Sequence, residues 1–465
     1  MSIVIFLILL LPVIYKTVKV KNGYLYLFCV LYPILPDTFA IELSSKLPLL
    51  TGARILLLIM LVLSIWKYSD EIEVNAMLFY PFIFIVINII ISLINLQYGT
   101  GEINRIFQLV AEEFLVIILL KRMIPSKEDF YDCIDALIYG SIIMGVIGIL
   151  QTTANIDVAS VLNITADRVG GSIEDRMNMT RAYGTMNAIS YGCYCTFMLP
   201  IILFRYEMTK KIKYIVSAVI VLGALLCSLT RSAMLVLGVV LLCMLVIRNK
   251  KFIKPYLKFL PLVLIGIVLV FIIYPKIWNI ITEIAKSYLS SLGVKVDLSD
   301  EFGSNGTNAY YSRNVQWSAI YRMIQEHKGA FGYGYNAFSR GELYYKFRQF
   351  TDWTKATALD VGFVGIAADS GLVGLASYIA LLGSIFVQAV RRVKRATYDF
   401  NFLTVFMVIL CVVMNVGTSF ANASLVWIYF ALFYVYNSLE EKEKKGKLHA
   451  ECYDGCDSQT MYTGV

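Results

Sequence analysis

The charged residue whose position most needs a chemical explanation is Arg231. It lies in CSLTRSAML, at the middle of an almost wholly apolar run that extends from Tyr214 to Ile247. An arginine at the centre of a bilayer costs from about 3 to more than about 10 kcal/mol, so a charge in such a run marks a functional site by default. That cost is avoided if the chain turns within LTRS, because Arg231 then lies at a membrane surface between two spans. The alternative is a snorkelling arginine at the interface that has no function.

Arg231 is joined by other arginines on the same predicted face of the membrane. Two long segments between spans, residues 153–186 and 276–357, contribute Arg168, Arg176, Arg181, Arg313 and Arg322. The planar guanidinium binds phosphate and carboxylate groups through two parallel hydrogen bonds. Several guanidinium groups at one membrane surface therefore fit a lipid-anchored pyrophosphate or an acidic sugar. Ion pairs with Glu174, Asp175 and Asp300 are the structural alternative.

The elements that must position these arginines are transmembrane helices. Of the 465 residues, 58% are hydrophobic and only 16% are charged, so the chain has more apolar surface than a soluble protein of this length can bury. A span needs about 20 apolar residues, and such runs recur along nearly the whole chain. We predict an all-α integral membrane protein with 12 or 13 transmembrane helices. The candidate spans are residues 1–15, 24–41, 52–66, 76–96, 103–120, 134–152, 187–204, 214–229, 232–247, 257–274, 359–390, 401–419 and 422–438.

Basic residues predict the orientation of these spans. Lysine and arginine gather in one set of connections and in the C-terminal tail, which the positive-inside rule places in the cytoplasm. The segment 276–357 lies on the other side and contains 16 aromatic residues, which indicates a folded lid. Within it, RNVQWSAIYRMIQEHKG predicts an amphipathic helix that Ser312 caps and Gly329 ends. The predicted regions are N-terminal transmembrane helices (1–152), a catalytic region (153–390), C-terminal transmembrane helices (391–438) and a cytoplasmic tail (439–465). The end of this tail, LHAECYDGCDSQTMYTGV, is expected to be disordered.

Other chemistries have little support in the sequence. D-x-D, H-E-x-x-H, paired C-x-x-C and P-loop patterns are missing, and the two histidines, His327 and His449, lie outside the spans. We therefore expect no metal, no cofactor and no nucleic-acid partner. Glu112 and Glu113 in the span 103–120 are a separate feature, since intramembrane carboxylates need a partner. One of the two must face the bundle, against an arginine of a neighbouring helix.

Four segments resemble, in order, the motifs of bacterial O-antigen polymerases and O-antigen ligases. They are RAYGTMN (Arg181 to Asn187), CSLTRSAML, the run from Arg313 through Trp317 to GAFGYGYNAF, and ALDVGFVGIAADSGLVGLASYIALL, which enters the next span. Together they extend over about residues 150 to 390. In the ligase branch the last segment begins with a histidine, and that position is Asp360 here. The family's glutamate position is Asp369, so the resemblance fits the polymerase branch better.

This resemblance implies a multispan, GT-C-like glycosyltransferase of the bacterial cytoplasmic membrane, active at its outer face. It would transfer a growing glycan from undecaprenyl pyrophosphate onto a lipid-linked repeat unit, with membrane lipid, a chain-length regulator and a flippase as partners. The implied catalytic residues are Arg181, Arg231 and Arg313, which would neutralise the departing pyrophosphate, and Asp360 as a base or sugar contact. The implied substrate-binding residues are Arg168, Arg176, Trp317, Tyr335 and Asp369.

The sequence leaves several alternatives open for the roles of these residues and for the function. Asp360 can instead stabilise the N-terminus of the following helix, and the aromatic side chains can form the core of the lid instead of stacking on sugars. An O-antigen ligase-type enzyme would use the same donor with another acceptor. A flippase or other transporter for lipid-linked oligosaccharides would need polar groups across the whole bilayer, whereas the arginines gather on one face. A structural scaffold would leave the aromatic lid unexplained.

Overall fold

The computed structural model describes most of the chain, and all structural statements refer to the described residues. These are residues 2–20, 22–35, 39–41, 50–67, 78–99, 101–156, 175–176, 179–230, 232–239, 282, 286, 315–346, 352–356, 359–393, 399–417 and 424–457. They form helices, with three short hairpins between them. The predicted catalytic residues Arg231 and Arg313 and the predicted substrate contact Arg168 lie outside this set.

The N-terminal half contributes a series of helices and two short strands. They are α1 (Ser2–Lys19), α2 (Gly23–Leu31), β1 (Ala40–Ile41), β2 (Leu50–Thr51), α3 (Gly52–Lys67), α4 (Phe79–Ile94), η2 (Asn95–Tyr98), α5 (Gly101–Phe107), η3 (Gln108–Phe114), α6 (Leu115–Met123) and α7 (Lys127–Ala154). The η3 segment is a π-helix, so α5, η3 and α6 follow one another with one wide turn in the middle. Ser126 begins α7 by accepting a hydrogen bond from the backbone N–H of Asp129, which is a standard N-cap.

The second half contains the remaining hairpins and the long helices. They are β3 (Asp175–Arg176), β4 (Met179–Thr180), α8 (Ala188–Thr209), α9 (Ile212–Cys227), α15 (Ser318–Gln325), β5 (Tyr344–Tyr345), β6 (Thr354–Lys355), α16 (Gly362–Arg392), α17 (Phe400–Gly417) and α18 (Ser424–Asp457). Residues 232–239 are also helical. Each hairpin pairs two consecutive strands in antiparallel register.

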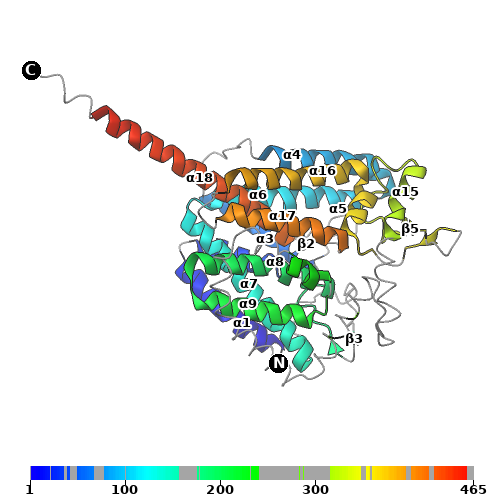
Figure 1. Ribbon diagram of the computed structural model, residues 1–465, viewed down its shortest axis with the longest axis horizontal. Helices are drawn as coiled ribbons and strands as arrows, with labels where there is room; N and C mark the ends of the chain where they lie inside the picture. Colours follow the sequence, from blue (N-terminus) through cyan, green and yellow to red (C-terminus); the bar gives the residue numbers. More distant parts are fainter. Residues whose placement is uncertain are drawn as a thin grey trace, which may run out of the picture.

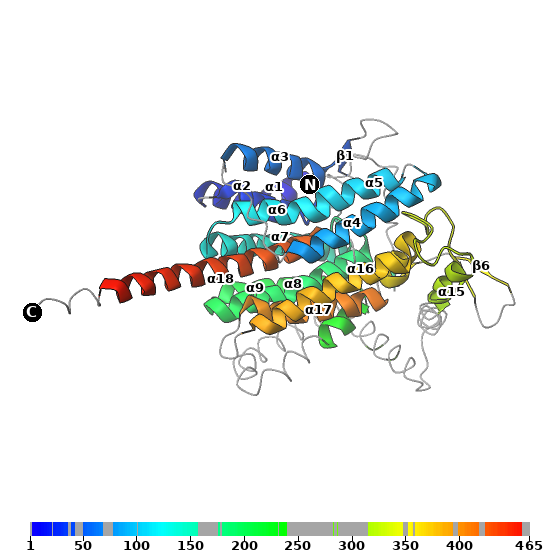
Figure 2. The same cartoon turned by 90° about the horizontal axis from the view of Figure 1, so that it is seen from above.

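The long helices run along a common direction and form one bundle (Figures 1 and 2). The C-terminal part of α18 extends beyond the bundle at one end, while α15 and the strands β5 and β6 lie at the opposite end. The polar connections that carry the predicted motifs are therefore gathered away from the C-terminal helix. We call this the motif end of the bundle.

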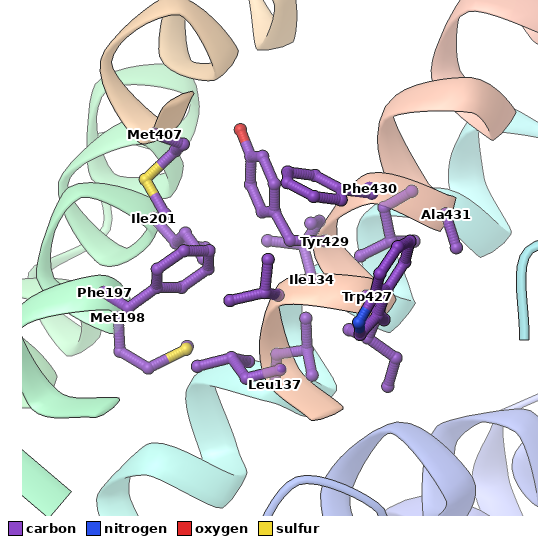
Figure 3. Packing of buried hydrophobic residues seen from close by; sticks show 14 of the residues in the cluster. Ile134, Leu137, Phe197, Met198, Ile201, Met407, Trp427, Tyr429, Phe430 and Ala431 are labelled. Atoms are coloured by element: carbon purple, nitrogen blue, oxygen red, sulfur yellow. The ribbon is translucent and has the colours of Figure 1, made fainter. Parts of the chain in front are cut away.

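The centre of the bundle is packed with large apolar side chains. Figure 3 shows Ile134 of α7, Phe197 of α8, Met407 of α17 and Trp427 of α18 in one cluster. These side chains are 2% exposed or less. Aromatic rings contact one another edge to face, as Phe197 and Tyr429 do with their centroids 5.5 Å apart. The polar motif segments are thus supported by a rigid apolar core.

Long apolar helices confirm the predicted fold class. Among the described residues, four helices are long and apolar enough to cross a membrane: Phe79–Tyr98, Lys127–Ala154, Ile189–Thr209 and Gly362–Arg392. Ile212–Cys227 and Phe400–Val416 are shorter apolar helices. The protein is therefore an all-α membrane protein, and the total of 12 or 13 spans stays a prediction.

Three predicted elements differ from those observed. The span expected over 24–41 is helical only to Leu31, because Pro33 and Pro36 follow and proline disfavours helix in the residue before it. The lid helix ends at Gln325, before Gly329, since His327 adopts a left-handed conformation with φ 59°. The tail expected to be disordered is helical to Asp457, because α18 continues from the last span.

Candidate functional site

The segment RAYGTMN joins β4 to α8 and is held against the end of α9 by its arginine. Arg181 is 3% exposed. Its Nε donates to the carbonyl oxygen of Ser228 at 3.0 Å, and its Nη2 donates to Thr230 Oγ1 at 3.3 Å. Ser228 caps the C-terminus of α9, where carbonyl groups lack helical partners and cationic side chains bind well. Arg181 therefore fixes the turn that leads directly to Arg231.

The same segment is fixed from a second side by Gln151 of α7. The buried Gln151 Oε1 accepts hydrogen bonds from the backbone N–H groups of Tyr183 and Gly184, at 3.1 and 2.8 Å. Its Nε2 donates to the carbonyl of Gly184 at 2.9 Å. Gly184 has φ +58°, and a Cβ atom there would lie 2.6 Å from Met144 Cε. Glycine suits this position because of the positive φ and because a Cβ atom would also lie 2.7 Å from the ring of Tyr191.

The turn after α9 confirms the predicted break between two helical segments. α9 ends at Cys227, and helix resumes at Ser232. Asn187 at the end of RAYGTMN accepts a hydrogen bond from the backbone N–H of Ser190 at 2.8 Å and so caps α8. Each of these motif residues thus has its own structural role, since the arginine holds the α9 turn, the glycine permits close contact and the asparagine begins a helix.

A second polar centre surrounds the loop FGYGYNAF, residues 331–338, which we call the glycine loop. Two carboxylates accept hydrogen bonds from its backbone N–H groups. Glu102 Oε1, from α5, lies 2.5 Å from the nitrogen of Tyr335, and Asp369 Oδ1, from α16, lies 3.0 Å from the nitrogen of Ala337. Glu102 is 1% exposed. Two helices that are far apart in the sequence therefore hold one loop through a buried carboxylate, that of Glu102, and a partly buried one, that of Asp369.

The carbonyl groups of the glycine loop are also bound. Asn95 Nδ2 donates to the carbonyl of Phe331 at 2.8 Å, and Arg340 Nη1 donates to the carbonyl of Tyr335 at 2.9 Å. Gly332 and Gly334 have φ +74° and +90°, which confirms the tight turn predicted for them. The loop is thus fixed by hydrogen bonds to both its donors and its acceptors, which gives it one well-defined conformation.

Helix α16 is kinked where it meets this loop. Gly371 has φ +69° inside the helix, and a Cβ atom on it would overlap the carbonyl oxygen of Ala330. The backbone N–H groups of Leu372 and Val373 donate to Gly329 and Ala330 at 2.8 and 3.2 Å. The kink leaves room for the chain to pass directly over the helix backbone, which explains the glycine in the sequence DSGLVG.

Two ion pairs lie at the π-helical segment η3, one buried (Arg105 with Glu113) and one partly buried (Arg54 with Glu112). Arg54 Nε of α3 is 2.5 Å from Glu112 Oε1, and Arg105 Nη1 of α5 is 2.8 Å from Glu113 Oε1. The predicted arginine of a neighbouring helix is confirmed for Glu112, which pairs with Arg54 of α3, whereas the partner of Glu113 belongs to α5, which runs directly into η3. Tyr335 of the glycine loop lies in the electrostatic field of both arginines and of Asp369, and burial raises the pKa of its hydroxyl. Single π-helical turns within α-helices are frequent at functional sites.

The other predicted site residues are spread around the motif end. Asp360 lies two residues before α16, and its backbone N–H and that of Val361 both donate to the buried Gln316 Oε1 at 3.0 Å. Trp317 begins α15 and is 38% exposed. Arg176 lies in β3, where its backbone pairs with Met179. The structure therefore brings Tyr335 and Asp369 together and places Asp360 at the start of the same helix as Asp369.

Sequence reasoning missed several residues that organise the two centres: Asn95, Glu102, Arg105, Gln151 and Arg340. A usable signal existed for Glu102 and Arg105, because GEINRIF places two charges at the edge of an apolar run. Gln151 and Asn95 gave no signal, since single amides near helix ends are common and their partners lie far away in the sequence.

Comparison with known families agrees with the position of these centres. No curated protein matches the chain. Residues 216–379 match a family model described as O-antigen ligase. The matched region contains the α9 turn that Arg181 binds, the glycine loop and the kink of α16. It also contains the second and third motifs and nearly all of the fourth, while RAYGTMN precedes it. The resemblance is thereby confirmed for residues 216–379, which are similar to the O-antigen ligase family.

Proposed function

We propose that the protein is a polysaccharide polymerase of the bacterial cytoplasmic membrane. It transfers a growing glycan from undecaprenyl pyrophosphate onto a lipid-linked repeat unit at the outer face, for a capsule or an O-antigen. The observation that carries this proposal is that the buried Arg181 donates hydrogen bonds to Ser228 and Thr230. Both acceptors lie inside the matched region, residues 216–379. Arg181 ties one proposed catalytic motif to the turn that carries another.

The proposed reaction is a displacement at the anomeric carbon of the donor sugar. An acceptor hydroxyl oxygen forms the new bond to this carbon, while the bond from carbon to the pyrophosphate oxygen breaks and its electron pair leaves with the pyrophosphate. Arg181, Arg231 and Arg313 stabilise the charge that develops on the leaving group. The Asp360 carboxylate accepts the proton of the acceptor hydroxyl. Proposed substrate contacts are Arg168, Arg176, Trp317, Tyr335 and Asp369.

Two described features support the sugar contacts near α16. The glycine loop is bonded to Asp369 and carries Tyr335, so both would be presented to a substrate as one rigid unit. Asp360 is fixed at the start of the same helix by Gln316. The proposed base, Asp360, and the proposed sugar contacts, Asp369 and Tyr335, are thus held by α16 and the loop bonded to it. Transfer requires such groups to be positioned within a fraction of an ångström. A flippase and a chain-length regulator are the proposed protein partners.

An O-antigen ligase-type transferase is the second candidate, because the matching family model carries that description. It would use the same donor and the same arginines, and would differ only in the acceptor. Asp360 at the histidine position of the ligase branch favours the polymerase. Supplying the purified protein with the lipid-linked repeat alone separates the two, since a polymerase elongates it and a ligase needs another acceptor.

The test uses the full chain in lipid with a synthetic undecaprenyl-pyrophosphate oligosaccharide. Wild type should give a ladder of products on a gel, with or without EDTA. Arg181→Lys should lose most of this ladder, because an ammonium group cannot make the two parallel hydrogen bonds of a guanidinium. Arg205→Lys is the matched control. Arg205 lies at the other end of α8, where its Nε pairs with Asp135 Oδ1 at 2.7 Å. An unchanged ladder in Arg181→Lys would contradict the proposed role of Arg181.

A further inference from the structure

Helix α15 has two apolar faces. With 100° of rotation per residue, Trp317, Tyr321 and Ile324 fall within a sector of about 60°. They are 38%, 61% and 50% exposed. Ala319 and Met323 lie on the opposite side, and both are buried in the cluster that includes Tyr345 and Val364. We call the exposed set Trp317, Tyr321 and Ile324 the outer stripe.

A helix packed on a water-exposed protein surface normally has one apolar face. The polar residues of α15, Ser318, Arg322 and Gln325, occupy one flank between the two apolar faces instead of the side opposite the core. The partly buried Ile320 occupies the other flank and joins the two faces. The outer stripe therefore lies where a helix in water would carry polar side chains. Large apolar side chains grouped in this way indicate that the outer stripe contacts an apolar neighbour.

The length of α16 indicates the level of the membrane surface. Its 31 residues, Gly362–Arg392, span about 46 Å, which exceeds the hydrocarbon thickness of about 30 Å. The basic Arg391 and Arg392 end it on the cytoplasmic side. A count of about 20 residues back from Val390 reaches the kink at Gly371. Leu372 and Val373, 39% and 41% exposed, then lie at the outer edge of the hydrocarbon.

The chain that follows α15 is attached at this same level. Gly329 and Ala330 accept the hydrogen bonds of Leu372 and Val373. Asn95, at the end of the span Phe79–Tyr98, donates to the carbonyl of Phe331, which is itself 40% exposed. Two independent spans therefore place the C-terminal side of α15 where the hydrocarbon ends.

We propose that α15 lies in the lipid–water interface of the outer leaflet, with the outer stripe in contact with lipid. Tryptophan and tyrosine are the residues enriched at this level. Near the same ends of the spans, α4, η2 and α16 also carry exposed apolar side chains. These are Leu93, Ile94, Leu96, Leu372 and Val373.

The polar flank of α15 fits this orientation. Arg322 Nε pairs with Glu326 at 2.5 Å, and the Arg322 guanidinium stacks 3.9 Å from the ring centre of Tyr344. The carboxylate of Glu326 also accepts a hydrogen bond from the hydroxyl of Tyr333 at 2.6 Å. The charged groups are thus turned toward β5 and the glycine loop, away from the outer stripe. An interfacial α15 holds the glycine loop at the membrane surface.

Spin labels on the full chain in phospholipid nanodiscs test this placement. Cysteine is introduced as Tyr321→Cys, as Ile324→Cys or, for the matched control, as Gln325→Cys on the polar flank. The background replaces Cys243, Cys452 and Cys456 by serine, and the same background without an added cysteine supplies the baseline. Collision of each label with oxygen, which concentrates in lipid, is compared with collision with a water-soluble nickel chelate.

The expected result is a higher ratio of oxygen to nickel collisions at positions 321 and 324 than at 325. A ratio at 321 and 324 no higher than at 325, with frequent nickel collisions, would place the stripe in water and overturn the proposal. Low collision rates with both reagents would show that protein covers it, either another segment of this chain or a second copy, and would also overturn it. Two stripe positions are used so that one poorly folded variant does not decide the outcome.

Discussion

The ion pair between Arg105 and Glu113 should make a large contribution to the stability of the bundle, in a way that depends on both partners. Glu113 is 1% exposed, and its Oε2 has no hydrogen-bond partner in the described part of the chain. Arg105→Met would leave this buried carboxylate without its only described cationic partner. Removing one member of a buried pair costs about 3–5 kcal/mol. An equilibrium constant of unfolding should therefore rise by at least about two orders of magnitude.

The assay is unfolding by SDS in mixed micelles, followed by far-ultraviolet circular dichroism. The double variant Arg105→Met/Glu113→Leu should recover most of the loss, because replacing a buried pair by apolar side chains is often neutral or stabilising. Lys127→Met is the matched control. Lys127 pairs with Glu443 at 2.7 Å, but the two side chains are 32% and 52% exposed, so the loss of this pair should cost about 0–1 kcal/mol.

Two results would refute this reasoning. A cost for Arg105→Met similar to that of Lys127→Met would mean that the pair is hydrated and adds little. A double variant no more stable than Arg105→Met would mean that Arg105 acts through packing and not through the charge of Glu113. A double-mutant cycle measures the coupling between the two residues directly.

Three further predictions follow from the motif end. Gly371→Ala should lower the thermal unfolding temperature because of the positive φ and the close approach of Ala330, whereas Gly383→Ala in the same helix, with open space around its Cβ, should raise stability by about 1 kcal/mol. Gln151→Ala removes three hydrogen bonds, worth about 1 kcal/mol each, and should reduce both stability and polymerisation. Burial raises the pKa of Glu326, but hydrogen bonds from its tyrosine and arginine partners lower it more, so the net pKa is below the ordinary value. The stabilisation that ionised Glu326 gives the folded state is therefore complete above about pH 4.3 and is lost as the pH falls below that value. Below about pH 4.3, hydrogen exchange of the lid should accelerate in wild type but not in Glu326→Gln.

The sequence predicted the features that depend on local composition and on short motifs. Apolar runs gave most helices within a few residues, because a span must satisfy its own backbone hydrogen bonds. The α9 turn and the glycine loop were found because they use residue types with a restricted set of conformations. The glutamate pair was found because a charge inside a span requires a partner.

What could not be predicted was which partner each polar residue would bind. Glu102 and Asp369 bind the same loop from positions 267 residues apart in the chain, and nothing local to either residue specifies this. The early end of α2 is a different case. Its prolines were visible, but the apolar content of residues 24–41 outweighed them in the span assignment. The helical continuation of α18 likewise depends on an element already started inside the membrane, which composition alone does not reveal.

The N-terminal helices have a role that the predicted regions understate. The boundary at residue 152 separates helices without motifs from a catalytic region, yet both motif centres are fixed by side chains on the N-terminal side of it. Gln151 holds RAYGTMN, and Asn95 and Glu102 hold the glycine loop. Transfer between two lipid-anchored sugars requires the donor and acceptor groups to be placed within a fraction of an ångström. The helices that carry Asn95, Glu102 and Gln151 therefore form part of the scaffold of the proposed active site, because both motif centres depend on the hydrogen bonds of these side chains.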